Sequence, residues 1–412
     1  MKILKALMLV VLILATSTAC AADNRAALKD FGEISKTVNN FSWNYYRQLD
    51  KSKNIFYSPY SIAAAFSIVA NGATGQTQKE ILNVLNTKEI KNLNGDFENF
   101  RALMEKNYSD ETVLKEADLI LVNKNHIGKG INSKFEKVVK EIYQSEIDAA
   151  DFSGNTDAEK ARIQNWVAKN TNDFIPNYEA SISADTIVDI LNVIYFKGSW
   201  QSPFETSKTW KSDFTNNNGK KSKVQMMSKT FEDSIAYYAD EKYMAVALPY
   251  KNNLAAMYII LPRRENDLNV AEDWDAEEIS YRENFLSNLK HAPIFDGIVE
   301  FFMPKFELDI KNKLNDDLQA MGINRAFTDD AEFYNIVKKM QLKISNATHQ
   351  AKVKVDEEGT EAAAVTEIDM VKATAVPIQP RTIYFRADRP FLFVIRDVAS
   401  EVDLFTGVVN SL

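Results

Sequence analysis

Apolar residues in the first quarter of the chain recur at intervals of three and four. The positions are Leu28, Phe31, Ile34, Val38, Phe41 and Tyr45. This spacing puts them on one face and predicts an amphipathic helix. A second helix is predicted from Ser58-Pro59 to Gly72, and a third after Thr77, because Glu80 three residues later completes a capping-box pattern.

Farther along, the period shortens toward two and the apolar runs become rich in β-branched and aromatic residues. The runs cover residues 119–122, 257–261, 299–303, 390–395 and 404–409. They predict strands, several apolar enough to be buried on both faces. Because helices come first and strands later, the fold class is predicted to be α+β. The length of 412 residues suggests two or three domains at roughly 150 residues each, but no repeat or linker supports a division.

The longest apolar run lies at the N-terminus. Lys2 and Lys5 precede residues 6–15, and the small residues 17–19 follow. This pattern predicts a secretory signal peptide over residues 1–19, too short to span a membrane.

Cys20, at the predicted cleavage region, is the chain's single cysteine, so an intramolecular disulfide is excluded. Export without disulfides indicates a bacterium. Ala19-Cys20 resembles a lipoprotein signal, in which the cysteine is acylated and holds the chain at the outer membrane or cell surface. The alternative is cleavage near Ala21 or Ala22 and a secreted protein. We favour Cys20 as the lipid attachment, because a lone leader cysteine otherwise has no role.

Composition and motifs exclude several classes of function. With 49 basic and 57 acidic residues, a net charge of −8 and no Lys/Arg block, the chain lacks the charge pattern of a nucleic-acid binder. His126, His291 and His349 have no metal-ligand spacing, and GxSxG, HExxH, CxxC, P-loop and GxGxxG motifs are absent. We therefore predict no enzyme, no metal and no cofactor, although a Ser/His/Asp site assembled from distant residues stays open.

The most unusual segment covers residues 355–377. From Thr360, one period-two face carries no charge: Thr360, Ala362, Ala364, Thr366, Ile368 and Met370. The other face carries three acids, as in a strand with one buried side. A fixed strand or a short Ala-rich helix in an exposed loop is the ordinary interpretation. The flexible start at residues 357–360 and the small residues favour a segment that is loop in one state and strand in another.

The sequence of residues 357–366, EEGTEAAAVT, resembles the hinge of the serpin family of protease inhibitors. Further segments resemble serpin motifs in the family's order: 54–61 (NIFYSPYS), 71–77 (NGATGQT), 192–200 (NVIYFKGSW), 248–250 (LPY), 302–306 (FMPKF) and 388–393 (DRPFLF). The resemblance covers essentially the whole mature chain. It implies the serpin fold, with N-terminal helices on large mixed sheets, as a single domain over residues 20–412.

The resemblance also implies a mechanism. A target protease attacks an exposed reactive-centre loop at about residues 357–377 and forms an acyl-enzyme. The cleaved loop then enters the central sheet as a new strand and traps the protease as a covalent 1:1 complex. The native protein would be a metastable monomer. The implied hinge residues are Glu357, Glu358, Gly359, Thr360, Glu361, Ala362, Ala363 and Ala364.

Family spacing locates the reactive bond. From the first hinge glutamate to the residue before the bond, the family spans seventeen positions, which from Glu357 end at Ala373 and place the bond at Ala373-Thr374. Alanine there suits elastase-like proteases. Lys372 would attract trypsin-like enzymes and is the alternative cleavage residue, leaving an inserted strand one residue shorter.

The resemblance further assigns a shutter beneath the point where the sheet opens and a breach at Trp200. The shutter residues are Ser58, Ser61, Asn192 and His349. A buried, satisfied hydrogen-bond network is expected there in any case. The alternative function is that of a non-inhibitory serpin acting as a binding protein. Such members tend to carry bulky, charged or proline residues on the inserting face, whereas this chain has Thr360, Ala362 and Ala364.

Overall fold

The computed structural model describes residues 31–108, 111–264, 266–360 and 381–412. Its α-helices are α2 Gly32–Tyr46, α3 Pro59–Gly72, α4 Gly75–Val84, α5 Ile90–Asn107, α6 Ser133–Glu141, α7 Thr156–Asn170, α8 Val270–Ala276, α9 Ile279–Lys290 and α10 Asn315–Met321. Short 3-10 turns are η1 Lys124–His126, η2 Thr206–Lys208, η3 Lys251–Asn253 and η4 Arg325–Phe327. None of the helices within these ranges has the length and apolar content needed to cross a membrane.

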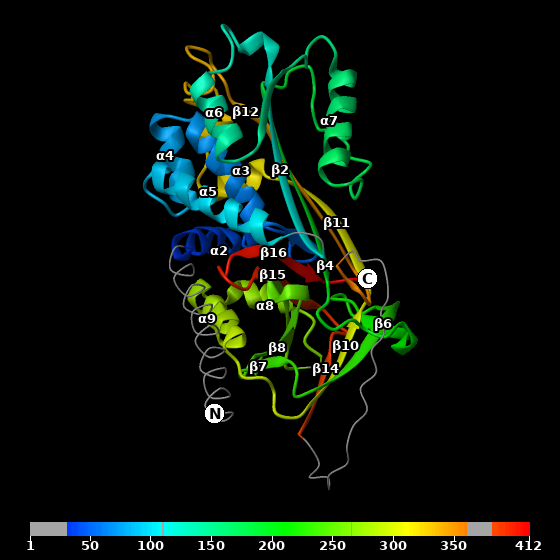
Figure 1. The fold of residues 1–412 in the computed structure, drawn as a ribbon. Coiled ribbons are helices and arrows are strands. Elements are labelled where there is room, and N and C mark those ends of the chain that lie inside the picture. Colours follow the sequence, from blue (N-terminus) through cyan, green and yellow to red (C-terminus); the bar gives the residue numbers. More distant parts are fainter. Residues whose placement is uncertain (1–30, 109–110, 265, 361–380) are drawn as a thin grey trace, which may run out of the picture.

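The strands form three sheets. The large sheet has the order β11-β12-β13-β4-β2-β3, a second sheet the order β1-β16-β15-β9-β8-β7, and a four-stranded sheet the order β14-β10-β6-β5. The first eight strands are β1 Ile55–Tyr57, β2 Thr112–Asn123, β3 Glu146–Ala150, β4 Val188–Ser199, β5 Thr209–Thr215, β6 Lys221–Glu232, β7 Ala236–Ala239 and β8 Tyr243–Pro249. The others are β9 Ala255–Pro262, β10 Ile298–Pro304, β11 Phe306–Lys313, β12 Ile344–Val355, β13 Gly359–Thr360, β14 Thr382–Arg386, β15 Phe391–Asp397 and β16 Asp403–Val409. The N-terminal helices gather at one end of the large sheet, and the four-stranded sheet lies toward the other (Figure 1).

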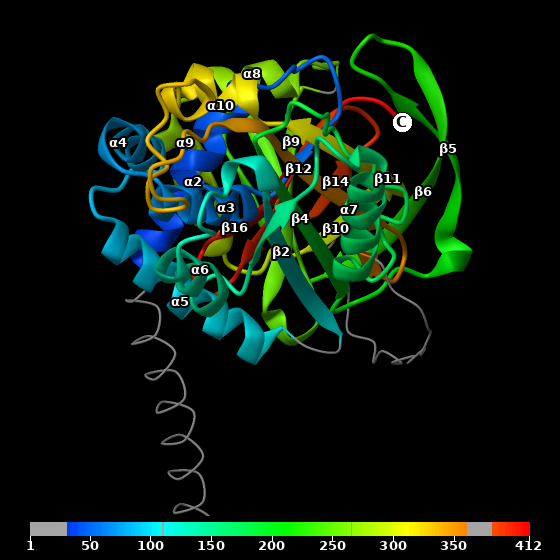
Figure 2. The ribbon, with the colours of Figure 1, turned by 90° about the horizontal axis from the view of Figure 1, so that it is seen from above.

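At β2 both faces of the large sheet are covered, by α7 on one side and by the main core on the other, which explains the continuous apolar run of residues 119–122. Leu119 and Leu121 of β2 pack with residues of α7 in one hydrophobic cluster. Their neighbours Ile120 and Val122 point the opposite way into the main core, because successive strand residues alternate between faces. Accordingly α3 and α7 lie on opposite sides of β4 (Figure 2).

The α+β class and the main predicted elements are confirmed. Within the described residues, the first two predicted helices are α2 and α3, and the five predicted apolar runs lie in β2, β9, β10, β15 and β16. The predicted start of the third helix, after Thr77, was wrong. Helix α4 begins at Gly75, and Thr77 is inside it. The reason is a distant carboxylate, since Glu332 accepts hydrogen bonds from the backbone N–H groups of Gln76 and Thr77 at 2.7 and 3.3 Å. That carboxylate satisfies the first free donors of the helix in place of a local cap.

Candidate functional site

The start of the predicted hinge already lies in the large sheet. β4 and β12 pair directly in parallel from Val188 and Ile344 up to Ile194 and Ala351. Beyond that point the two strands admit β13 between them. β13 is antiparallel to both, with Gly359 and Thr360 opposite Ser199 and Gly198 of β4, and Thr360 opposite Val355 of β12. Sequence reasoning treated residues 357–360 as a flexible connection, whereas Thr360 is fully buried here.

A tight turn joins β12 to β13 and is held by the segment that follows β4. The backbone N–H groups of Trp200 and Phe204 each donate to carbonyl oxygens of the turn, those of Glu358 and Glu357, at 2.8 Å. The indole Nε1 of Trp200 donates to the carbonyl of Asp356 at 3.0 Å. These three bonds fix the turn from one side, so the predicted breach residue Trp200 contacts the hinge directly.

Gly359 is required by a close approach of two backbones. A Cβ atom at this position would lie 2.1 Å from the carbonyl oxygen of Gly198 and 2.7 Å from the Cα of Ser199. Neither atom belongs to a side chain that could move aside. Any other residue at position 359 would therefore displace β13 from β4.

The carboxylate of Glu357 anchors the same turn. It accepts a hydrogen bond from Thr209 Oγ1 at 2.8 Å and forms an ion pair with Lys305 Nζ at 2.6 Å. Burial raises the pKa of this carboxyl, but the hydrogen bonds from Lys305 and Thr209 outweigh burial and hold the pKa below its usual value. Glu357 is thus ionised at neutral pH and links the hinge to β5 and to the junction between β10 and β11.

Thr360 ends the described part of the hinge in an aromatic environment. Its hydroxyl forms a 2.7 Å hydrogen bond with the hydroxyl of Tyr250. The Tyr250 ring stacks on Trp200, with ring centroids 4.6 Å apart. Trp200 and Tyr250 are both buried. The hinge is therefore contacted by its own backbone partners and by this stacked pair.

The structure brings the four predicted shutter residues together beneath the hinge. Asn192 Nδ2 donates to Ser61 Oγ at 2.6 Å, and its Oδ1 lies 2.5 Å from His349 Nδ1. The backbone N–H of Ser58 donates to His349 Nε2 at 3.0 Å. Because Asn192 and His349 are opposite each other on β4 and β12, the bond between them crosses the boundary that a new strand would have to open.

The hydrogen bonds of His349 define its protonation. Nε2 accepts the Ser58 N–H, so the ring proton is on Nδ1 and is donated to Asn192. Burial lowers the pKa of His349 to about 3, which keeps the ring neutral at physiological pH.

Sequence reasoning missed Asp118, a fifth member of this network. Its carboxylate accepts hydrogen bonds from Asn192 Nδ2 at 2.6 Å and from Ser145 Oγ at 3.0 Å. Burial raises the pKa of Asp118 to about 6, although these hydrogen bonds and the charge of Arg101 act in the opposite direction. The only signal in the sequence was an acid directly before the buried run of residues 119–122.

Several predicted site residues lie outside the described residues. They are Cys20, Glu361, Ala362, Ala363, Ala364, Lys372, Ala373 and Thr374. Among the residues that the structure does describe, no group of three or more His, Cys, Asp or Glu side chains is arranged to hold a metal ion.

Comparison with known proteins decides the family. A sequence profile described as "Serpin (serine protease inhibitor)" matches residues 36–412. The chain belongs to the serpin family. Among related serpins, it is 32% identical over 397 residues to Iris of the tick Ixodes ricinus, covering 92% of this chain and 99% of Iris. It is also 32% identical over 379 residues to an uncharacterized serpin-like protein of Thermococcus kodakarensis, covering 91% and 84% of the two chains.

Solved serpin structures share the fold. Tengpin, a thermophilic serpin in its native state, matches with a TM-score of 0.80 and 26% identity over 91% of this chain and 93% of tengpin. Human thyroxine-binding globulin matches with a TM-score of 0.80 and 26% identity over 93% and 99%. The matched family is described as one of serine protease inhibitors. The fold is shared with a thyroxine-binding protein, so inhibition by this serpin has to be argued from its hinge.

Proposed function

We propose that this serpin is an irreversible inhibitor of serine proteases that traps the acyl-enzyme by inserting its cleaved loop between β4 and β12. Cysteine proteases that form a thioester at the same bond are further targets. The partner is the protease in a 1:1 complex, and the serpin acts as a monomer.

The position of β13 carries this proposal. Gly359 and Thr360 already occupy the start of the slot between β4 and β12 and pair with both strands. Because β4 and β12 run parallel to each other, a strand that enters between them can run antiparallel to both, and β13 has this direction. The residues that continue the Thr360 face at period two, Ala362 and Ala364, are small and uncharged. Entry of such residues into the sheet meets little steric or desolvation resistance.

The covalent step follows ordinary acyl transfer. The protease serine Oγ attacks the carbonyl carbon of Ala373, and the bond from that carbon to the nitrogen of Thr374 breaks. The serine proton passes through the protease histidine to the amine of Thr374, which leaves. The ester left on Ala373 awaits water, so trapping requires insertion to distort the protease before hydrolysis occurs.

Insertion replaces one row of backbone hydrogen bonds, between β4 and β12, with two rows, one on each side of the inserted strand. The parallel pairing of β4 with β12 is lost, together with the hydrogen bond from His349 to Asn192 that crosses it. Residues 360–373 would span about 46 Å as a strand. A dozen additional backbone hydrogen bonds at roughly 0.5–1.5 kcal/mol each would contribute on the order of 10 kcal/mol. This gain in free energy is large enough to drive insertion of the loop while the protease is attached to it.

The test is incubation with an elastase-like and a trypsin-like protease, followed by denaturing gels and mass determination of the released C-terminal peptide. We expect a complex that survives SDS and a peptide starting at Thr374. A peptide starting at Ala373 would assign the main bond to Lys372. Cleavage without any stable complex would instead indicate the non-inhibitory binding function, and turnover by a chain lacking the loop would indicate a hydrolase.

We also propose that export leaves the mature chain attached through lipidated Cys20 at the bacterial outer membrane or cell surface. Radiolabelled palmitate should label the expressed protein but not its Cys20→Ala variant. An unlabelled parent, secreted and starting near Ala21 or Ala22, would favour the ordinary signal peptide.

A further inference from the structure

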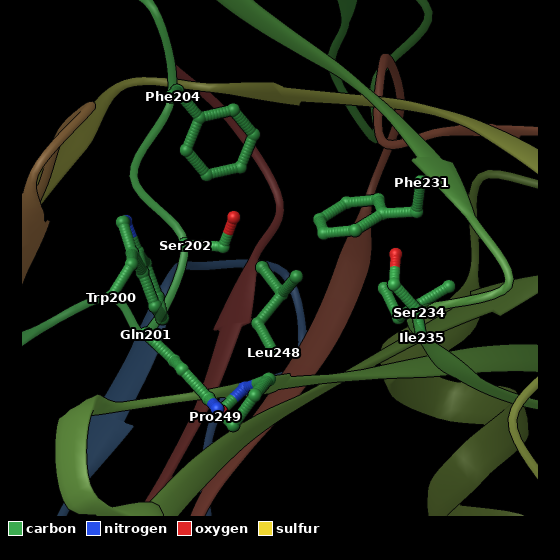
Figure 3. A pocket seen from close by; sticks show the side chains of 9 residues that line it. All are labelled: Trp200, Gln201, Ser202, Phe204, Phe231, Ser234, Ile235, Leu248 and Pro249. Atoms are coloured by element: carbon green, nitrogen blue, oxygen red, sulfur yellow. The ribbon is translucent and has the colours of Figure 1, made fainter. Parts of the chain in front are cut away.

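A cavity of about 280 Å³ lies behind the segment that holds the hinge turn. Buried apolar side chains, among them Trp200, Phe204, Phe231 and Leu248, form its inner walls. Ser202 and Ser234, both exposed, line it on the solvent side. Figure 3 shows the hydroxyl of Ser202 pointing into the space among Phe204, Phe231 and Leu248. The cavity therefore has an apolar interior and a polar entrance.

A positive charge stands at this entrance. The ammonium group of Lys229 donates to Ser202 Oγ and to the Pro203 carbonyl at 2.6 Å, and to the Ser202 carbonyl at 3.1 Å, all of them uncharged acceptors. It lies 5.6 Å from the centre of the Phe231 ring. Lys229 forms no ion pair with any described residue, and Glu205, the acid that most affects it, pairs with Lys208. Partial burial lowers the pKa of Lys229, as expected for a cation without a paired anion. A ligand anion at this entrance would supply the missing countercharge.

The cavity wall and the hinge share one stretch of backbone. Trp200 and Phe204 line the cavity with their side chains, while their backbone N–H groups donate to Glu358 and Glu357 in the turn. A molecule packed against these two rings would restrict the segment that holds the turn. Occupancy of the cavity and order of the hinge are thus linked through two residues.

We propose that the cavity binds a medium-length amphipathic carboxylate, such as a fatty acid of about eight carbons, and that binding steadies the hinge turn. At roughly 30 Å³ per non-hydrogen atom, the share of one water in the liquid, 280 Å³ holds about nine such atoms, close to the ten of an eight-carbon carboxylate whose oxygens lie at the entrance. The apolar chain would lie on Trp200, Phe231 and Leu248, with the carboxylate at Lys229 and the Ser202 hydroxyl. This inference does not depend on protease inhibition.

The first test is calorimetric titration of the intact serpin, without protease, with octanoate. One molecule is expected to bind with a dissociation constant on the order of 100 µM. Lys229→Met should weaken binding about tenfold, through loss of the charge-assisted contact. Ser234→Phe, at an exposed position, should fill the entrance and abolish binding. Lys79→Met, which removes an exposed lysine of α4, is the matched control and should bind like the parent.

One neutral and one cationic analogue of octanoate test whether the ligand must carry a negative charge. Octan-1-ol should bind to the parent at least tenfold more weakly than octanoate does. Its affinity for Lys229→Met should equal its affinity for the parent. Octylamine should not bind. Octanoate binding that is absent, or that is unchanged by both Lys229→Met and Ser234→Phe, would overturn the site.

Hydrogen–deuterium exchange tests the link to the hinge. Saturating octanoate should slow exchange several-fold in peptides covering residues 354–360 of the parent, and should have no such effect in Ser234→Phe. Slower exchange confined to residues 231–249, with the hinge unchanged, would refute the coupling.

Discussion

At the scale of single residues, the surroundings of two buried carboxyl groups shift their pKa values in opposite directions. Glu357 has a cation within 2.6 Å and a pKa below the usual value, so its ionised form is stabilised by folding. Asp118 has only neutral hydrogen-bond donors in contact, and its pKa rises to about 6. The first charge therefore strengthens the fold at neutral pH, and the second weakens it.

Removing the cation of the first pair should loosen the hinge turn. We expect Lys305→Met to lower the free energy of unfolding at pH 7 by about 1–3 kcal/mol, because the buried carboxylate of Glu357 then keeps the hydroxyl of Thr209 as its only side-chain donor. Urea denaturation measures the change. Lys354→Met, which removes an exposed lysine of β12, is the control and should be within about 0.5 kcal/mol of the parent. Equal losses in both variants would mean that the pair with Glu357 contributes nothing.

Neutralising Asp118 should produce a pH-dependent gain. Its folded pKa of about 6 exceeds the unfolded value near 3.8, so the stability that this group contributes is present below pH 3.8 and lost as pH rises through 6. Asp118→Asn is expected to be more stable than the parent by about 1–3 kcal/mol at pH 8, and similar to it at pH 4. Urea midpoints at the two pH values decide. A gain of the same size at both would assign the effect to packing instead of charge.

At the scale of elements, the slot between β4 and β12 depends on contacts between segments far apart in sequence. The two strands close directly at the shutter and separate at the breach, where β13 lies between them. Gly359 permits that arrangement by its contact with Gly198. An element of two residues thus marks where further strand would enter.

Gly359→Ala should expel this element. The added Cβ meets backbone atoms at 2.1 and 2.7 Å, so β13 must leave β4, and Thr360 must leave Tyr250. Limited proteolysis should then cleave at residues 357–360 at least tenfold faster than in the parent, and stable complexes with protease should decrease. Gly95→Ala is the matched control, because a Cβ there meets nothing within 4 Å and helix α5 should gain slightly. Resistance of Gly359→Ala equal to that of the control would contradict the close approach.

Local patterns allowed the elements to be predicted, but not their long-range partners. The apolar runs located strands such as β9 and β15, because burial on both faces leaves a direct mark on sequence. The start of α4 was predicted wrongly, since its cap is Glu332, more than 250 positions away. Asp118 was missed for the same reason. The hydrogen bonds that it accepts from Asn192 and Ser145 depend on the register of β2 with β4 and on a neighbouring loop. The resemblance to serpins named the shutter and hinge residues, and the geometry shows what the shutter residues and hinge residues 357–360 contact.

At the scale of the whole molecule, the proposed inhibition requires that the sheet accept thirteen more residues, 361–373, because Thr360 already belongs to β13. The driving energy would come from strand pairings that the native state has not yet formed, because β4 pairs directly with β12 and β13 occupies only the start of the slot. The two faces of the entering strand differ, because every second residue must be buried against the sheet's covered interior. A charge on one face should therefore stop insertion, whereas the same charge on the other face should be tolerated.

Ala362→Arg and Ala363→Arg separate these faces with the same substitution on adjacent alanines. Ala362 continues the Thr360 face and Ala363 the opposite one. We expect Ala362→Arg to be cleaved as a substrate, with at least tenfold more inhibitor consumed per protease molecule trapped, because burying an unpaired guanidinium opposes insertion. Its cleaved form should also fail to show the rise in melting temperature that strand insertion gives the parent. Ala363→Arg should keep both properties. If Ala362→Arg forms complexes that survive SDS as well as Ala363→Arg does, the loop traps protease by a route that does not bury the Thr360 face.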